Sequence, residues 1–344
     1  MRSNRVTLAD VARDAGLSKT AASMILNGRP DTRLSKEAHE RVHAAAARLG
    51  YRPNVNAVAL FTGKTSTLAL ISDEVATTRF ATGLIRGALG AAEAAHHVLL
   101  VLETGGQPAR ESAALNAALD RQVDGLIFAT MRARDLYVPE LPPGTSVVML
   151  NSTNPVFSTS VLPDEEVGGR VAVEHLVARG HKEGIALIGQ SDRAEHGVFR
   201  SPNIERRTRG IRTAMAEHGL EFIAEESVWN WEPENGYKLT KKVLRQHPDV
   251  RVLVCMNDRL AFGAYQALGD AGRQVPNDVS VISFDDDEVG AYLRPGLTTV
   301  ALPHEAMGAL AVELLLSDPD PREHLVPMPL IKRQSVALLQ HERA

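Results

Sequence analysis

The stretch Ser18-Lys-Thr-Ala-Ala-Ser-Met-Ile-Leu26 decides how the N-terminal part of this chain folds. Ala22, Ile25 and Leu26 fall at positions i, i+3 and i+4, which predicts a short helix with one buried face. Ser18 is a favourable N-cap, because its hydroxyl can accept a hydrogen bond from a first-turn amide. The rest of the helix surface carries two side-chain pairs at i, i+4 spacing, which are Lys19 with Ser23 and Thr20 with Met24.

A second short helix is predicted just before this stretch, in Thr7-Leu-Ala-Asp-Val-Ala-Arg-Asp-Ala15. Thr7 and Asp10 have the spacing of a capping box, although Asp stands where Glu or Gln is usual. Gly16 can adopt the positive φ that ends a helix. Two short helices joined by a glycine-containing turn are typical of a helix-turn-helix, whose second helix enters the major groove of DNA. The alternative is a small helical hairpin of the kind found in many proteins that never bind DNA.

The charge distribution favours DNA binding over that alternative. Residues 1–64 hold 11 Lys and Arg against 5 Asp and Glu, a net charge of +6. Residues 65–344 hold 27 basic and 37 acidic residues, a net charge of −10. A basic head on an acidic body is expected when only one end of a protein approaches phosphates.

A third helix beginning after Ser35 is expected to complete a small three-helix core. Between the second and third helices, residues 27–33 form a turn-rich loop whose basic side chains suit backbone phosphates. The segment Asn54–Gly63 that follows the head is too short to be a stable helix alone. It is either a passive linker or a hinge helix that orders on DNA and inserts Leu60 into the minor groove. Folding coupled to binding would let a distant ligand control DNA affinity through this segment.

From Thr67 onward, short apolar runs alternate with helical patterns, which predicts parallel, doubly wound sheets. The predicted strands are residues 67–71, 97–102, 125–128, 146–150, 184–188, 250–254 and 279–284. The predicted helices are residues 82–95, 110–121, 166–179, 205–218, 234–246, 259–271 and 304–316. About 280 residues of this pattern exceed one usual domain and favour two α/β lobes. Ligands of such sheets bind beyond the carboxyl ends of the strands.

Composition places the protein in the cytoplasm. No run of the 344 residues is long and apolar enough to span a bilayer. The N-terminus has no apolar signal core, so export is not expected. The single cysteine, Cys255, lies in an apolar run and is interpreted as a small buried hydrophobic residue and not as a nucleophile.

The residues quoted above, with further motifs along the chain, closely resemble the lactose/galactose repressor family. The resemblance rests on Thr7-Leu-Ala-Asp-Val-Ala, Ala15-Gly-Leu-Ser18, Leu26-Asn27, Leu49-Gly-Tyr-Arg-Pro-Asn54, Glu174-His-Leu, Arg179-Gly-His181, Asn257-Asp-Arg-Leu-Ala-Phe-Gly263, Val275-Pro-Asn-Asp-Val-Ser-Val-Ile-Ser-Phe-Asp-Asp286 and Leu297-Thr-Thr-Val300. It covers almost the whole chain in order.

The resemblance implies an all-α helix-turn-helix head and a two-lobed α/β core like that of periplasmic sugar-binding proteins. The head is expected at 1–53, a hinge helix or linker at 54–64, and an effector-binding and dimerisation core at 65–344. Lobe 1 is expected at about 65–163 and 295–325, and lobe 2 at about 164–294 and 326–340. The resemblance also implies a homodimer or dimer of dimers on a palindromic operator, whose affinity a small metabolite, usually a sugar, changes.

The resemblance assigns base reading to Lys19, Thr20 and Met24. Most members carry Arg at the position of Met24, and Arg makes the bidentate bonds to guanine that Met cannot make. We therefore expect the corresponding base to be read by apolar contact or hardly at all. Val58 likewise replaces an Arg common in the hinge. The full set of expected DNA-binding residues is Thr7, Ser18, Lys19, Thr20, Ser23, Met24, Asn27, Arg33, Tyr51, Asn54, Ala57 and Leu60.

For the ligand, the resemblance points to Arg207, Trp231, Asn257 and Asp285. Their chemistry suits a polyol, because Arg and Asp offer charge-assisted bonds to hydroxyls and an indole face stacks on a pyranose ring. Three of them have a plainer interpretation: a solvated charge for Arg207, a core residue for Trp231 and a helix cap for Asn257. Residues 285–288 could be mistaken for a metal cluster, but we expect a solvated loop with Asp285 alone turned inward. Further expected ligand-binding residues are Asp73, Phe80 and Asp164. The loop of residues 72–80 departs from the family pattern, which leaves an oligosaccharide open as the ligand.

The leading hypothesis is a ligand-responsive transcription regulator, most simply a repressor of a carbohydrate operon. A purine or another metabolite acting as co-repressor is an alternative ligand. A sugar-binding transport protein shares the core fold, but the basic head and the missing signal peptide argue against it. An enzyme is not expected, because the sequence lacks a nucleophile elbow and a phosphate-binding loop. The acidic run Asp285-Asp-Asp-Glu288 has no His or Cys beside it, so neither a metal nor another cofactor is expected.

Overall fold

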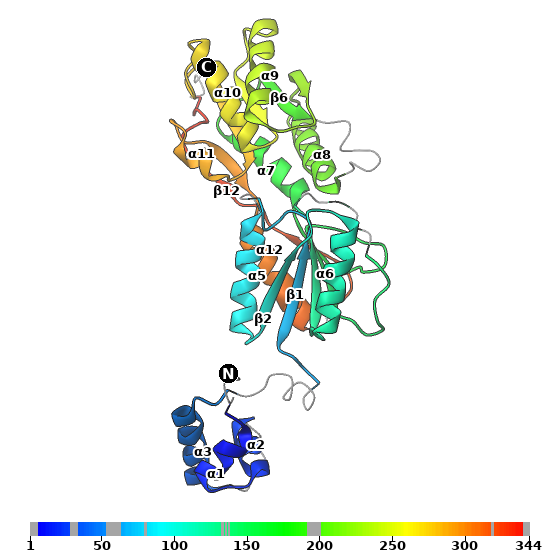
Figure 1. Cartoon of the computed structure of the whole chain (residues 1–344). Helices are drawn as coiled ribbons and strands as arrows, with labels where there is room; N and C mark the ends of the chain where they lie inside the picture. The colour runs from blue at the N-terminus through cyan, green and yellow to red at the C-terminus, as the bar shows by residue number, and fades with distance from the viewer. Residues whose placement is uncertain are drawn as a thin grey trace. The chain divides into compact units, whose positions relative to one another are not determined.

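The computed structural model describes residues 6–27, 34–52, 63–78, 81–131, 134, 136, 138–190, 201–317 and 320–339 (Figure 1). The chain divides into two compact units. The first consists of Met1–Thr67 with Gln122–Asp124, and the second of Leu68–Arg121 with Gly125–Ala344. We call the first unit the head and the second the core.

The described part of the head contains three helices: α1 (Leu8–Ala15), α2 (Lys19–Leu26) and α3 (Lys36–Leu49). The capping box is confirmed, because the Asp10 amide donates to Thr7 Oγ1 at 3.4 Å and the Thr7 amide donates to Asp10 Oδ2 at 3.0 Å. Gly16 ends α1 with a φ of +68°. Ala22 and Ile25 of α2 pack with apolar residues of α1 and α3 into one small core. The predicted helical pair and third helix are therefore confirmed.

The first lobe of the core is built on a six-stranded sheet in the order β11-β5-β4-β3-β1-β2. Its strands are β1 (Thr67–Ser72), β2 (Val98–Glu103), β3 (Gly125–Ala129), β4 (Val147–Leu150), β5 (Ser160–Pro163) and β11 (Glu323–Val326). The pairs β1–β3, β3–β4, β4–β5 and β5–β11 are all parallel. Helices α5 (Thr82–Ala94) and α6 (Pro108–Asp120) flank the strands on opposite sides in Figure 1, and α12 (His304–Leu316) packs against α5.

The second lobe has its own six-stranded sheet in the order β12-β10-β9-β8-β6-β7. Its strands are β6 (Ile185–Gln190), β7 (Phe222–Ser227), β8 (Val252–Cys255), β9 (Ser280–Asp285), β10 (Thr298–Ala301) and β12 (Leu330–Ile331). Only β12 pairs antiparallel, against β10. The helices are α7 (Glu165–Ala178), α8 (Pro202–Glu217), α9 (Pro233–Gln246), α10 (Asp258–Asp270) and the short α11 (Glu288–Tyr292).

One expected lobe boundary is wrong. Residues from 295 were assigned to the first lobe, but β10 pairs in parallel with β9 and so belongs to the second sheet. The chain returns to the first lobe only at α12. After β11 it crosses again to the second lobe, where β12 lies. All seven predicted strands exist, while β5, β7, β10, β11 and β12 were not predicted.

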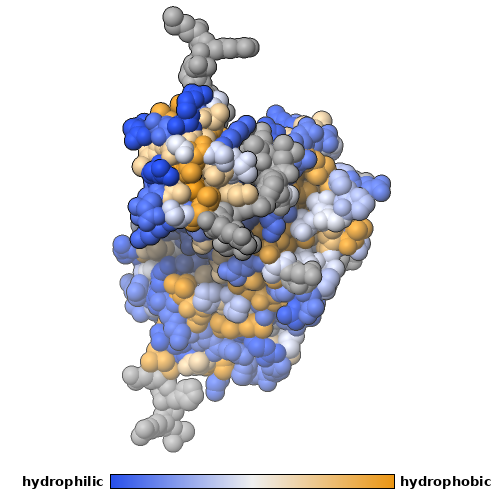
Figure 2. Space-filling model, turned by 90° about the horizontal axis from the view of Figure 1, so that it is seen from below, coloured by the Kyte–Doolittle hydropathy of each residue, from blue (hydrophilic) through white to orange (hydrophobic). Residues whose placement is uncertain are grey.

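Three further features concern the surface, the helices and the single cysteine. Hydrophilic residues surround apolar patches of limited extent on the face that Figure 2 shows. None of the helices in the described ranges is both long enough and apolar enough to pass through a bilayer. Cys255 is fully buried in β8, as its apolar neighbours predicted.

Candidate functional site

A pocket with a cavity of about 220 Å³ opens between the two lobes of the core. Met131 and Asn151 reach it from the first lobe, where they follow β3 and β4. Trp231, Asn257 and Asp285 reach it from the second lobe, where they lie after β7, after β8 and at the end of β9. These lining residues lie at or just beyond the carboxyl ends of strands, which is where open α/β sheets bind ligands.

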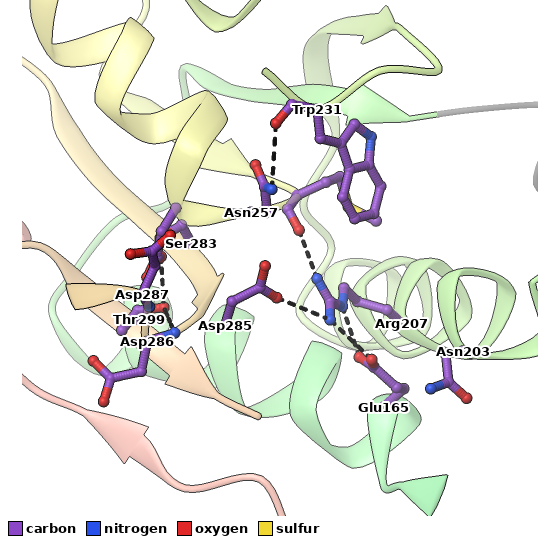
Figure 3. A network of polar contacts seen from close by, with 12 residues as sticks. Glu165, Asn203, Arg207, Trp231, Asn257, Ser283, Asp285, Asp286, Asp287 and Thr299 are labelled. Atoms are coloured by element: carbon purple, nitrogen blue, oxygen red, sulfur yellow. Dashed lines mark hydrogen bonds and ion pairs between the residues drawn. The ribbon is translucent and has the colours of Figure 1, made fainter. Parts of the chain in front are cut away.

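Arg207 of α8 lies in the floor of this pocket, with only 3% of its surface exposed. Its Nε and Nη2 donate to the two carboxylate oxygens of Glu165 at 2.6 and 2.8 Å, and its Nη1 donates to the Met256 carbonyl at 2.6 Å (Figure 3). The guanidinium also lies 4.5 Å from the ring centroid of Phe284. Burial alone would lower the pKa of Arg207, but the Glu165 carboxylate raises it, so the guanidinium stays charged.

Two glycines bring α7 and α8 close enough for this ion pair to form. A Cβ on Gly169 would lie 2.3 Å from the Arg207 carbonyl oxygen, and one on Gly210 would lie 2.0 Å from the Glu166 carbonyl oxygen. Only glycine therefore fits at either position. Because the two backbones touch here, the side chains of Glu165 and Arg207 meet in a bidentate pair.

Asp285 places a second carboxylate in the pocket. Its Oδ1 is 3.5 Å from Arg207 Nη2, and its side chain is 21% exposed. Its φ of +106° is rare for a residue with a side chain, and such strain persists where the surroundings enforce it. Burial raises the pKa of Asp285 to about 6, against the lowering effect of Arg207. At pH 7 the group is mostly ionised and able to accept hydrogen bonds.

Both tryptophans of the chain, Trp229 and Trp231, line the pocket. Trp231 Nε1 donates to the Gly189 carbonyl at 2.8 Å, which fixes the ring and leaves its apolar surface for a ligand. Asn257 caps α10, because its Oδ1 accepts from the Leu260 amide at 2.8 Å. Its Nδ2 is 3.4 Å from the Trp231 carbonyl. The plainer interpretation of Asn257 as a cap is thus confirmed, although its side chain also faces the pocket.

An amide pair joins the two lobes across the pocket. Asn151 Nδ2 donates to the carbonyls of Thr130 and Met131 at 2.9 and 3.2 Å, so its Oδ1 faces the other lobe. There it accepts from Asn203 Nδ2 of α8 at 3.1 Å. This network fixes both amide orientations and leaves Asn203 Oδ1, which is buried, without a hydrogen-bond partner within the described chain.

The exposed side of α2 forms the candidate DNA-reading surface in the head. Lys19 and Thr20 are exposed, while Ser23 and Met24 are half-buried. Ser18 caps the helix through the Ala21 amide at 3.1 Å, and Asn27 Nδ2 donates to Ser23 Oγ at 3.2 Å. Thr7 is engaged in the capping box and Tyr51 packs partly against the head core. Arg33, Asn54, Ala57 and Leu60 lie outside the described residues.

Comparison with known proteins decides the family. Residues 7–54 match the model of "Bacterial regulatory proteins, lacI family", and residues 173–336 match that of a "Periplasmic binding protein-like domain". The chain is 30% identical to catabolite control protein A of Priestia megaterium, over 90% of this chain and 91% of that protein. It is also 30% identical to the HTH-type transcriptional repressor PurR of Erwinia tasmaniensis, over 96% of this chain and 97% of that protein.

The chain belongs to the lacI family of bacterial regulatory proteins. Among solved structures it is similar to the Lac repressor dimer bound to operator and the anti-inducer ONPF. That similarity has a TM-score of 0.78 and 26% identity, and covers 97% of this chain and all of the other. The lacI-family chain is accordingly a DNA-binding transcription regulator with a helix-turn-helix head.

Four of the expected ligand residues of this lacI-family protein line one pocket: Arg207, Trp231, Asn257 and Asp285. Asp73 is not among its lining residues, and its carboxylate accepts instead from the Met131 amide at 2.9 Å and from Arg134 Nη2 at 3.2 Å. Asp164 caps α7 through the Val167 amide and lies at a different surface groove. Phe80 lies outside the described residues.

Several lining residues were not predicted, above all Glu165, Asn203 and Asn151. Glu165 has the sequence signature of an ordinary acidic residue in the first turn of a helix, which is a favourable position anywhere on a protein surface. Asn203 does carry a weak signal, because it lies one helical turn before Arg207 and therefore on the same face of α8.

Proposed function

We propose that this lacI-family regulator is a repressor whose affinity for its operator is set by a small carbohydrate bound in the core pocket. The observation that carries the carbohydrate is the pairing of two tryptophans with a fixed set of polar side chains in one cavity. Indole faces stack on sugar rings, and carboxylates and amides hydrogen-bond hydroxyls. The cavity of about 220 Å³ lies below the range of about 300–1,000 Å³ for drug-sized ligands and suits one sugar ring better than an oligosaccharide.

The proposed DNA partner is a palindromic operator bound by a homodimer. The solved Lac repressor complex is a dimer on operator with a small molecule, which supports the same assembly for this chain. The exposed apolar residues Leu89 of α5 and Val98 of β2 offer surface for a second copy. Segment 54–64 serves in this proposal as the hinge, and the core from residue 65 as the effector-binding and dimerising part.

Within this proposal the side chains of α2 read bases, and the core pocket senses the metabolite without converting it. Relatives named as repressors, PurR of Erwinia tasmaniensis and the ribose operon repressor of Escherichia coli, support a non-catalytic role. The place of action is the cytoplasm, where operator DNA lies. A purine remains the second candidate ligand, because indole faces also stack on nucleobases.

The experiment that tests the proposal is a thermal-unfolding screen of the full chain against sugars, sugar phosphates and nucleobases, followed by operator titration with each hit. A ligand that binds only the native state raises the melting temperature by mass action. We expect a neutral sugar to raise it, to change operator affinity and to remain chemically unchanged.

Two neighbouring aspartates provide the matched control for the screen. Asp285→Asn removes the pocket carboxylate and should abolish the ligand-induced rise. Asp286→Asn removes a carboxylate that pairs with Arg333 at 2.6 Å outside the pocket lining, and should retain the rise. A sugar that is turned over, or a ligand that binds Asp285→Asn as tightly as wild type, would contradict the proposal.

A further inference from the structure

The guanidinium of Arg207 is neutralised inside the protein, although it lines the pocket. The Glu165 carboxylate accepts hydrogen bonds from both Nε and Nη2 in a bidentate pair, and the Met256 carbonyl accepts one from Nη1. Glu165 is 2% exposed, so water does not compete with Arg207 for its carboxylate. A ligand anion that approached Arg207 would have to displace a buried, charge-assisted fork.

The second guanidinium in the lining is also paired. Arg259 Nε donates to Glu232 Oε2 at 3.1 Å, and Arg259 Nη2 bonds the same oxygen. The described lining residues thus contain two guanidiniums, Arg207 and Arg259, against three carboxylates, Glu165, Glu232 and Asp285. Asp285 is left as the carboxylate with only a 3.5 Å contact to Arg207. Among the described lining residues, carboxylates therefore outnumber guanidiniums by one, and the remaining titratable group is His304.

The hydrogen-bond acceptors of the pocket also disfavour an anionic ligand. Asn203 Oδ1 is a buried acceptor without a partner in the described chain, and its orientation is fixed by the Asn151 amide. The Asp285 carboxylate is likewise an acceptor. A ligand that bonds the partly exposed Asp285 carboxylate must offer hydrogen-bond donors, such as hydroxyl or amine groups, and one that reached the enclosed Asn203 Oδ1 would have to do the same.

We propose that Glu165 is the residue that sets ligand class in this pocket. Because Glu165 binds Nε and Nη2 of Arg207, it excludes anionic ligands such as sugar phosphates. The site that is left suits a neutral or cationic ligand with many hydrogen-bond donors. This inference rests on the proposed function of the pocket as the effector site. It predicts that removing the Glu165 charge converts the pocket into an anion site, because Arg207 stays charged and buried.

The test compares thermal unfolding of the full-length protein in about 20 mM inorganic phosphate and in chloride of equal ionic strength. The variants are wild type, Glu165→Gln and the control Glu166→Gln. Glu166 is the next residue of α7, but its side chain is exposed, pairs with Arg209 at 2.7 Å and lies outside the pocket lining. We expect phosphate to raise the melting temperature of Glu165→Gln by roughly 3–6 °C and to leave wild type and Glu166→Gln unchanged.

Two outcomes would overturn the inference: a phosphate response in wild type equal to that of Glu165→Gln, or a folded Glu165→Gln without any response. If Glu165→Gln melts cooperatively only in phosphate, that recovery is the positive result. If it never melts cooperatively, Glu165→Asp replaces it. Aspartate keeps the charge that neutralises Arg207, so Glu165→Asp should show no phosphate response, as in wild type, and a phosphate response in Glu165→Asp contradicts the inference.

The readout separates this inference from the proposed function. The phosphate response is measured without DNA and reports only on Arg207 and Glu165. A selective response in Glu165→Gln, combined with operator binding that no metabolite changes, would uphold the pocket assignment and refute the regulatory role.

Discussion

Asp258 is fully buried at the start of α10, one residue after Asn257 of the pocket lining. Its Oδ1 accepts from Thr299 Oγ1 at 2.8 Å and from Ser283 Oγ, and its Oδ2 accepts from the Asp287 amide at 2.8 Å. Burial and the nearby Asp285 carboxylate nevertheless raise the pKa of Asp258 to about 8. The buried charge is therefore a source of pH-dependent stability.

The sign of that dependence follows from proton uptake. In the unfolded chain the pKa is near 3.8, so between pH 4 and 8 the folded protein binds more protons than the unfolded protein. The free energy of unfolding should fall as pH rises, by up to about 1.4 kcal/mol per pH unit for this group. Between pH 7 and 8, where Asp285 is already mostly ionised, urea titration should show a falling free energy of unfolding in wild type and a flatter profile in Asp258→Asn.

Asp270→Asn is the control for this prediction. Asp270 lies at the other end of α10, is exposed and accepts from Tyr237 Oη at 2.7 Å. This variant should retain the wild-type slope. A wild-type protein whose stability is as independent of pH as that of Asp258→Asn would show that the burial of Asp258 is not coupled to its protonation.

Met24 is the residue that distinguishes the DNA-reading surface of α2. It is half-buried and has no hydrogen-bonding group to match guanine, so the base it faces should be weakly specified. Selection of binding sites from random DNA should return no invariant guanine there, and Met24→Ala should change affinity by less than about threefold. Lys19→Ala, which alters an exposed charge of the same helix, should weaken binding clearly. An invariant guanine that is lost in Met24→Ala would contradict this account.

Some site residues were predictable from sequence and others were not, for a physical reason. The family resemblance pointed to Asp285, Asn257 and Trp231, and all three lie at or after the carboxyl ends of strands, which meet at one edge of a parallel sheet. Glu165 is 42 residues from Arg207, and its role exists only because α7 and α8 pack with their backbones in contact. No local pattern in the sequence reports that packing.

At the scale of elements, three helix pairs of the core pack through glycines. In α5 and α12, a Cβ on Gly87 would lie 1.9 Å from the Glu305 carbonyl oxygen, and one on Gly308 would lie 2.0 Å from that of Leu84. The pair α9 and α10 repeats this through Gly236 and Gly263, as α7 and α8 do beside the pocket. Backbone contact replaces side-chain interdigitation at these three crossings.

This packing predicts opposite effects for two glycines of α5. Gly87→Ala forces α5 and α12 apart and should destabilise the core by about 1–3 kcal/mol, as overpacking does. A Cβ on Gly90 would meet no atom within 4 Å beyond its own helix, so Gly90→Ala should stabilise by up to about 1 kcal/mol through helix propensity. Urea unfolding of both variants measures the difference, and equal effects would refute the packing argument.

The elements that sequence reasoning missed share a physical feature. The strands β7 and β11 lie at the sheet edges, with half-exposed patterns and acidic residues that do not form an apolar run. In β10, Thr298 and Thr299 are fully buried because their hydroxyls take part in hydrogen bonds, to the Arg333 amide and to Asp258. Apolar patterning therefore missed edge strands that carry acidic residues and a strand whose buried threonines are specified by tertiary hydrogen bonds.

At the scale of the whole molecule, the chain consists of a basic head and a core whose two lobes meet at the pocket. Direct polar links between the lobes include Asn151 with Asn203 at 3.1 Å and Arg206 with Glu323 at 2.7 Å. A ligand that contacts Asn151 of the first lobe as well as Asp285 of the second would favour one lobe arrangement over another, and a difference in lobe arrangement is what a hinge segment can transmit to DNA.

The most direct test of this account is a titration of the full-length protein against the palindromic site returned by selection, with and without the sugar found in the thermal screen. The account predicts specific binding that weakens steeply between about 50 and 200 mM salt. It also predicts that the sugar changes the affinity at least about tenfold, a coupling of about 1.4 kcal/mol. Binding without preference for any palindromic site, or an affinity that no pocket ligand alters, would contradict it.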